Sequence, residues 1–148
     1  KPTREESAKR KYDCCEKAIA SSCSALGTCY RAQALHTTKL IVNELGLRDD
    51  QWSIAFQSRL GRTPWIKPYT DEVIPDLAKR GVKSLTVVTP SFVADCLETI
   101  EEIGDRAKNV FTDAGGESFT RVECLNSRPS WAKAIAEMVY RQRFQRKV

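Results

Sequence analysis

A short apolar stretch, a proline and a long acidic segment together constrain this chain more than any other feature. Residues Ser84–Thr89 are rich in β-branched side chains and almost continuously apolar, as expected of a strand that is covered on both faces. Pro90 has no N–H to donate to a sheet, and Ser91 can cap a following helix. The stretch therefore predicts a central parallel strand that leads directly into a helix.

The predicted helix has two different faces. Apolar residues at helical spacing predict one face packed on the sheet, formed by Val93, Leu97, Ile100, Ala107, Val110 and Phe111, with Cys96 and Ile103 beside them. The other face carries an acidic stripe formed by Asp95, Glu98, Glu102 and Asp105. Such a stripe is commonly a solvated surface. The alternative is a binding site, because ligands of open parallel sheets bind beyond the carboxyl ends of the strands, where Asp95 and Glu98 would lie.

The composition is that of a folded domain. Of the 148 residues, 41% are hydrophobic and 29% are charged, and no apolar run suits a membrane-spanning helix or a signal peptide. We therefore expect a cytoplasmic globular lobe. The net charge of +5 comes partly from the basic end of the chain, which could contact anionic lipid. Phe144 is the only aromatic residue among these charges, so nucleic-acid binding is not expected.

Six cysteines and one histidine form no recognisable metal motif. Four of the cysteines lie near the beginning of the chain but include no C-x-x-C pair, and a reducing compartment favours free thiols: Cys14, Cys15, Cys23 and Cys29. Metal binding by this group is the alternative. His36 has no ligand partner at suitable spacing, so we interpret it as a surface or packing residue. No G-x-G-x-x-G follows a predicted strand, which argues against a nucleotide site.

Further helices and strands alternate along the chain. Helices are expected at Gln33–Leu45, Asp71–Arg80 and Pro129–Phe144, and strands at Trp52–Ser58 and Phe119–Cys124. With the central strand and the acidic helix, this order predicts a three-layer α/β sandwich, in which helices flank a short parallel sheet. Residues 1–27 show no clean periodicity and are expected to be a separate, divergent segment, whereas residues 28–148 form the lobe.

Several motifs resemble those of the ferrochelatase family, whose members insert ferrous iron into protoporphyrin to make haem. The most specific is Ser91–Ile103, which reads SFVADCLETIEEI. Others flank it in the expected order: Phe56–Arg59 with Gly61, Trp65, Pro68–Glu72, Ala114–Glu117, and Cys124–Asn126 with Pro129. The resemblance covers about Tyr30 to Arg143 and implies one of the two Rossmann-like lobes of a chelatase.

The resemblance also implies roles for five residues. Glu98 matches the family's catalytic glutamate, and Glu102 matches the next carboxylate in a series proposed to carry metal or protons; a carboxylate can serve as a base and as an oxygen ligand. Trp65 matches a tryptophan that lines the porphyrin cleft, where flat rings can stack. Asp95 and Cys96 would contact substrate beside Glu98, and Cys96 stands where many members have histidine.

No cofactor is implied by this resemblance, because ferrous iron is the substrate. Some members carry an iron–sulfur cluster, but the C-terminal cysteine group that usually holds it is absent, so a cluster is not expected. The family's opposing histidine lies in a His-Gly-x-Pro motif that residues 1–27 lack. We therefore expect a fragment or partial enzyme, completed by a complementary chelatase lobe or by homodimerisation, with a peripheral membrane contact as a further family trait. The alternatives are a non-catalytic porphyrin- or metal-binding lobe and a remnant without a role of its own.

Overall fold

The computed structural model describes residues 28–57 and 65–144, and the chain divides into two compact units, Lys1–Thr70 and Asp71–Val148. The first unit contains helix α2 (Tyr30–Glu44) and the short 3-10 helix η2 (Asp49–Gln51). The chain turns after α2 at Gly46, whose φ of 64° is the left-handed conformation that glycine adopts without strain. The helix expected at Gln33–Leu45 is therefore confirmed, with a start at Tyr30.

The strand expected at Trp52–Ser58 is wrong for the described part of that stretch. Phe56 instead makes an isolated parallel bridge to Tyr69. Its N–H donates to the Pro68 carbonyl at 2.8 Å, and its own carbonyl accepts the Thr70 N–H at 3.1 Å. The Phe56 ring is buried, with its centroid 6.4 Å from that of Tyr30. An isolated bridge holds this segment, since strands need a longer series of paired neighbours than residues 52–57 obtain here.

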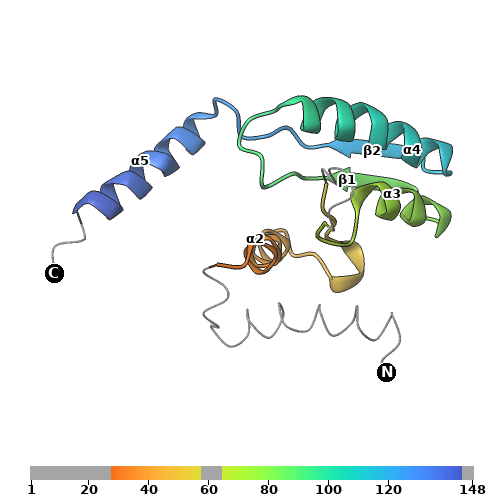
Figure 1. The fold of residues 1–148 in the computed structure, drawn as a ribbon, viewed down its shortest axis with the longest axis horizontal. Coiled ribbons are helices and arrows are strands. Elements are labelled where there is room, and N and C mark those ends of the chain that lie inside the picture. The colour runs from red at the N-terminus through yellow and green to blue at the C-terminus, as the bar shows by residue number, and fades with distance from the viewer. Residues whose placement is uncertain (1–27, 58–64, 145–148) are drawn as a thin grey trace, which may run out of the picture. The chain divides into compact units, whose positions relative to one another are not determined.

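The second unit has the alternation expected of a parallel α/β lobe. Its elements are α3 (Thr70–Lys79), β1 (Ser84–Val87), η3 (Glu98–Ala107), α4 (Lys108–Asp113), β2 (Ser118–Arg121) and α5 (Pro129–Phe144). Strands β1 and β2 pair in parallel, from Ser84 opposite Ser118 to Val87 opposite Arg121, and η3 and α4 form the crossover between them (Figure 1). The α/β class and the Rossmann-like character of the lobe are confirmed.

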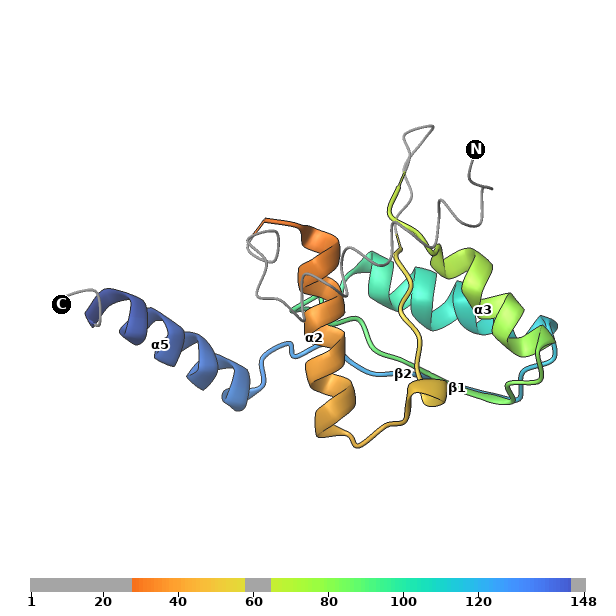
Figure 2. The same ribbon diagram turned by 90° about the horizontal axis from the view of Figure 1, so that it is seen from below.

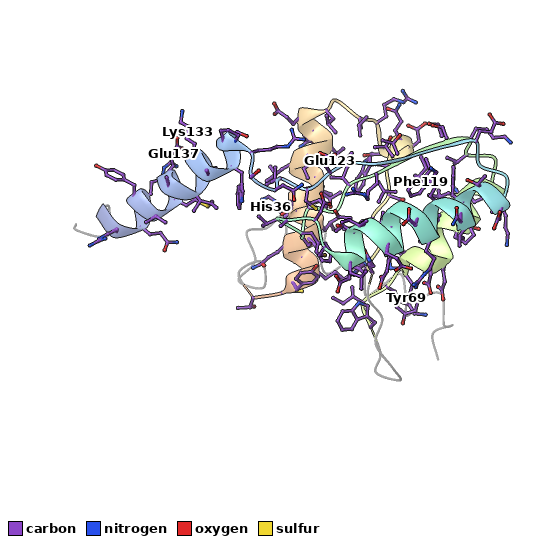
Figure 3. All side chains as sticks on the ribbon, turned by 90° about the horizontal axis from the view of Figure 1, so that it is seen from above. His36, Tyr69, Phe119, Glu123, Lys133 and Glu137 are labelled. Carbon is purple, nitrogen blue, oxygen red and sulfur yellow. The ribbon has the colours of Figure 1, made fainter. Side chains whose placement is uncertain are left out.

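Helices α3 and α4 pack on the same face of this sheet (Figure 2). The buried centre is formed by Ile74, Ala78 and Phe111, surrounded by partly buried side chains that include Leu85 and Phe119. The Phe119 ring, labelled in Figure 3, lies with its centroid 5.9 Å from that of Phe111. The described residues of this unit thus supply a sheet layer and one helical layer.

Strand β1 is only half-buried, so the prediction that both of its faces are covered is wrong for the described structure. Leu85 and Val87 are partly buried, whereas the alternate residues Ser84 and Thr86 are exposed. The same alternation occurs along β2. One helical layer explains this pattern, because successive side chains of a strand point to opposite faces of the sheet.

The acidic segment forms a π-helix, η3, that continues into the α-helix α4. The predicted apolar face is wrong at its N-terminal end, because Leu97 is 72% exposed and Ile100 is 50% exposed. Buried side chains instead occur at Thr99, Ile103 and Phe111. A π-helix has i→i+5 hydrogen bonds and therefore a wider turn, so residues four apart share a face more closely than 3.6-residue periodicity predicts.

Helix α5 has the bounds predicted from the sequence, and it carries several exposed apolar side chains in the described structure. Ile135 is 41% exposed, Met138 is 50% exposed and Val139 is 58% exposed. Among the helices that the structure describes, none is both long enough and apolar enough to cross a membrane.

Candidate functional site at the start of the π-helix

Two loops meet at the carboxyl edge of the parallel sheet. The segment after β1 leads into η3, and the segment after β2 leads towards α5. The Asn126 N–H donates to the Val93 carbonyl at 2.9 Å, and the Asn126 amide oxygen accepts the Asp95 N–H at 2.8 Å. Asn126 adopts a φ of 48°, a conformation that asparagine tolerates better than most residues. These contacts place Asp95 and the first turn of η3 where open parallel sheets bind ligands.

The Asp95 carboxylate is surrounded by donors from both loops. Its Oδ1 accepts a hydrogen bond from Arg121 Nη1 at 2.6 Å, and its Oδ2 accepts one from Asn126 Nδ2 at 2.8 Å. The Thr99 hydroxyl lies 3.0 Å from Oδ1, and the Cys124 N–H lies 3.5 Å from it. The hydrogen bonds from Asn126, Thr99 and Cys124, that of Asn126 foremost, hold the pKa of Asp95 well below its ordinary value. Asp95 is therefore an anion throughout the physiological pH range.

Thr99 ties Asp95 to the first turn of η3. Its side chain is fully buried, and its hydroxyl accepts the Cys96 N–H at 3.0 Å. The same hydroxyl lies 3.1 Å from the Cys96 carbonyl and can donate either to it or to Asp95. The hydroxyl thus satisfies a backbone N–H that has no partner within the helix, as a capping side chain does.

Glu98 is a partly buried carboxylate at the beginning of η3. A hydrogen bond from the Cys96 side chain lowers the pKa of Glu98, and the Glu98 backbone N–H acts in the same direction. Cys96 itself is a partly exposed free thiol. An ionised Glu98 can bind a divalent cation through oxygen and can accept a proton from a nearby acid.

The predicted acidic stripe is reduced to two neighbouring carboxylates. Glu102 is also partly buried and lies four residues after Glu98, one turn further along the π-helix. Asp95 precedes η3 and is engaged by Arg121 and Asn126, whereas Asp105 is exposed. The stripe that we predicted from α-helical spacing is therefore wrong, because Asp95 precedes the helix and the turn of a π-helix is wider than that of an α-helix.

Trp65 belongs to the first unit. Its indole Nε1–H donates to the Gln57 carbonyl at 2.8 Å, and the residue remains 40% exposed. The hydrogen bond fixes one edge of the indole and leaves apolar ring surface accessible. Such an anchored flat ring can stack on another flat ring.

The remaining metal and cysteine predictions are only partly covered by the described residues. Within residues 28–57 and 65–144, no three His, Cys, Asp or Glu side chains gather as a metal site would require. Cys29 and Cys124 are free thiols, and His36 is partly exposed on α2 (Figure 3). Cys14, Cys15 and Cys23 lie outside the described residues, as does the rest of the divergent segment 1–27.

Sequence reasoning missed the residues that hold Asp95. Thr99 and Asn126 lie inside the motifs that carry the family resemblance, but neither was assigned a role. Arg121 gave no signal, since a basic residue in a predicted strand is ordinarily a solvated one. In the structure its side chain is 19% exposed and faces the 15% exposed side chain of Asp95.

Fold and site together define a parallel α/β lobe that presents carboxylates at the carboxyl edge of its sheet. A family model described as ferrochelatase matches residues 18–143. The chain is 54% identical over 129 residues to the ferrochelatase of Pseudomonas fluorescens (strain Pf0-1), and 54% identical over 123 residues to that of Ectopseudomonas mendocina (strain ymp). The chain belongs to the ferrochelatase family.

The similarity covers most of this chain but a smaller share of its relatives. The Pseudomonas fluorescens match includes 87% of this chain and 37% of the relative. The match to the Ectopseudomonas mendocina protein includes 83% of this chain and 35% of the relative. The chain thus spans little more than a third of the length of these relatives.

Proposed function

We propose that this chain supplies the glutamate-bearing part of a ferrochelatase, which inserts ferrous iron into protoporphyrin. The observation that carries the proposal is the family match across residues 18–143, which includes the partly buried, ionised Glu98 at the carboxyl edge of the sheet. The relatives are named ferrochelatases. The substrates proposed for this chain are a porphyrin and a divalent metal ion.

Metal insertion requires removal of two pyrrole protons and delivery of a partly desolvated metal ion. Glu98 is the residue proposed to contact the reacting atoms, as a proton acceptor and as an oxygen ligand, and Glu102 is the next carboxylate to receive a metal ion or a proton. The hydrogen bond from Cys96 favours the ionised form of Glu98, which is the form that binds metal. Trp65 is proposed to stack on the porphyrin, since its indole is anchored and exposed.

Zinc insertion into a soluble porphyrin, followed by fluorescence, tests the proposal. The assay uses the 148-residue chain and a chimera in which this chain's matched 129 residues replace those of the Pseudomonas fluorescens ferrochelatase. In the chimera, Glu98→Gln is expected to lower the rate about a hundredfold or more, because the proton acceptor is lost. Glu101→Gln is the matched control, since Glu101 pairs with Arg106 on the same helix. A Glu98→Gln chimera with the full rate would refute the assignment.

Binding without turnover is the second candidate function. The sequence has one histidine, His36, and it lies in α2 rather than in a motif matching the family's catalytic histidine. A chain that binds porphyrin or metal but needs another polypeptide, or a second copy, for the opposing wall would fit this observation. Absorbance titration with porphyrin separates the two functions, because the second gives a saturable spectral shift with no metallated product from the chain alone.

The proposed partner is either a second copy of the chain or a complementary chelatase lobe, and measuring the oligomeric state tests both. Size-exclusion chromatography with and without porphyrin shows whether a second copy joins the chain, and mixing with the remaining part of the Pseudomonas fluorescens relative tests a complementary lobe. The proposed cytoplasmic location rests on the composition of the chain, and the proposed peripheral membrane contact rests on the family resemblance. Co-sedimentation with anionic vesicles tests the contact. Binding of neutral and anionic vesicles to the same extent would argue against headgroup recognition by the basic end of the chain.

A further inference from the structure

Two side chains that follow the crossover in the sequence hold Asp95, which lies three residues before the start of η3. Arg121, at the end of β2, and Asn126, in the loop after it, contact opposite oxygens of the Asp95 carboxylate at 2.6 and 2.8 Å. The Asn126 amide also accepts the Asp95 backbone N–H. Asn126 therefore holds both the main chain and the side chain of Asp95, while Arg121 supplies a compensating charge.

The position of Arg121 also matches the inner face of the π-helix. A Cβ added at Gly104 would lie 3.3 Å from Arg121 Nε, so the guanidinium lies close beside the second turn of η3 as well as beside Asp95. The ion pair is shielded from water, with side-chain exposures of 19% and 15%. Charge-assisted hydrogen bonds in such surroundings are strong and geometrically specific.

Further hydrogen bonds connect Asp95 to the turn that carries Glu98, the proposed reacting group. Asp95 contacts the Thr99 hydroxyl, and Thr99 accepts the Cys96 N–H. Cys96 in turn donates from its side chain to Glu98. A continuous series of hydrogen bonds therefore connects Arg121 and Asn126 to the turn that carries Glu98.

We infer that Arg121 and Asn126 are positioning residues, which hold Asp95 and thereby fix the first turn of η3 so that Glu98 is presented in one geometry. The inference rests on the proposed function for its catalytic consequence, but the fixing of the turn can be measured without turnover. It also changes the role of Asp95. Because its carboxylate oxygens already accept hydrogen bonds from Arg121, Asn126, Thr99 and Cys124, Asp95 acts through the turn rather than by contacting substrate.

Amide hydrogen exchange of the 148-residue chain tests whether Asn126 fixes the first turn of η3. Asn126→Gly removes the amide contacts but accepts the left-handed backbone at this position, so the fold should survive. Exchange should rise about tenfold in residues 95–103 and stay unchanged in α4. Ser127→Gly, at the neighbouring exposed position, is the control for added chain flexibility. Unchanged exchange in residues 95–103 of Asn126→Gly would overturn the inference.

Steady-state kinetics of the chimera tests whether fixing this turn matters for catalysis by Glu98. Arg121→Met and Asn126→Gly should lower kcat roughly ten- to a hundredfold with little change in the porphyrin KM, because a misplaced group loses transition-state contacts. Arg121→Lys keeps the charge and should recover part of kcat. Phe119→Leu loosens the core of β2 without touching Asp95, so it reports what general destabilisation does. Equal losses of kcat in Phe119→Leu and Asn126→Gly at matched stability would refute a positioning role.

The hydrogen-exchange and kinetic measurements together distinguish a wrong positioning role from a wrong proposed function. If the unsubstituted chimera makes no zinc porphyrin, the proposed function fails, and the exchange measurement still decides whether Arg121 and Asn126 fix the turn. If the chimera is active, normal kcat in Arg121→Met and Asn126→Gly overturns the inference even where exchange has risen.

Discussion

At the scale of single residues, the negative charge of the Asp95 carboxylate contributes to the stability of the fold. Asn126, Thr99 and Cys124 lower its pKa relative to the unfolded chain, so the ionised form stabilises the fold. That stabilisation is complete above the unfolded-state pKa of about 3.9 and is lost as the pH falls through the folded-state value. The acid sensitivity of the second unit therefore depends on this side chain.

Asp95→Asn should lower the free energy of unfolding at pH 7, and the difference from the unsubstituted chain should shrink as the pH falls below about 4. Urea titrations at pH 7 and at pH 3 measure the two differences. Asp76→Asn removes an exposed ion pair with Arg80 and serves as the control. Equal differences at both pH values would show that ionisation of Asp95 does not stabilise the fold.

Gly116 is a second position where one residue decides the packing. A Cβ at this position would overlap the ring of Phe111, which is fully buried. Gly116→Ala is therefore expected to cost about 1–3 kcal/mol of unfolding free energy, as overpacking in a core does. Urea unfolding measures the loss, with Ser118→Ala at an exposed position as the control. Stability equal to that of the control would mean that the ring moves aside without cost.

At the scale of elements, the π-helix decides which side chains are buried. Its wider turn places Thr99 and Ile103 on the inner face and exposes Leu97 and Ile100. Thr99 is the only one of these four with a polar group, and its hydroxyl serves the Cys96 N–H. A buried hydroxyl at residue 99 is therefore needed to satisfy the Cys96 N–H at the beginning of η3.

Thr99→Val keeps the shape of the side chain but leaves the Cys96 N–H without its partner. The expected loss is about 1–2 kcal/mol of unfolding free energy. Thr112→Val, where the exposed hydroxyl bonds the Lys108 carbonyl, is the matched control and should change stability by less than about 0.5 kcal/mol. Thermal and urea unfolding of both variants provide the comparison, and similar losses in the two would contradict the capping role.

At the scale of the whole molecule, the second unit depends on a small core shared by α3, α4 and the two strands. Phe111 is its fully buried centre, so Phe111→Ala should cost about 3–5 kcal/mol and unfold much of this unit. Val110→Ala, at a 37% exposed neighbour in the same helix, should cost far less. Far-ultraviolet circular dichroism during urea unfolding measures both. A Phe111→Ala chain as stable as Val110→Ala would place the main core elsewhere.

Local patterns in the sequence determined the parallel α/β order, the position of the acidic segment and the bounds of α5, because helix period, proline and glycine act over a few residues. The motif Ser91–Ile103 likewise predicted a catalytic role for Glu98, which stays a prediction. Only the tertiary structure decided that the acidic segment is a π-helix and that residues 52–57 obtain a single bridge rather than a strand. The engagement of Asp95 by Arg121 and Asn126 joins residues 26 or more positions apart, and contacts of that range depend on strand pairing, which short-range periodicity does not encode.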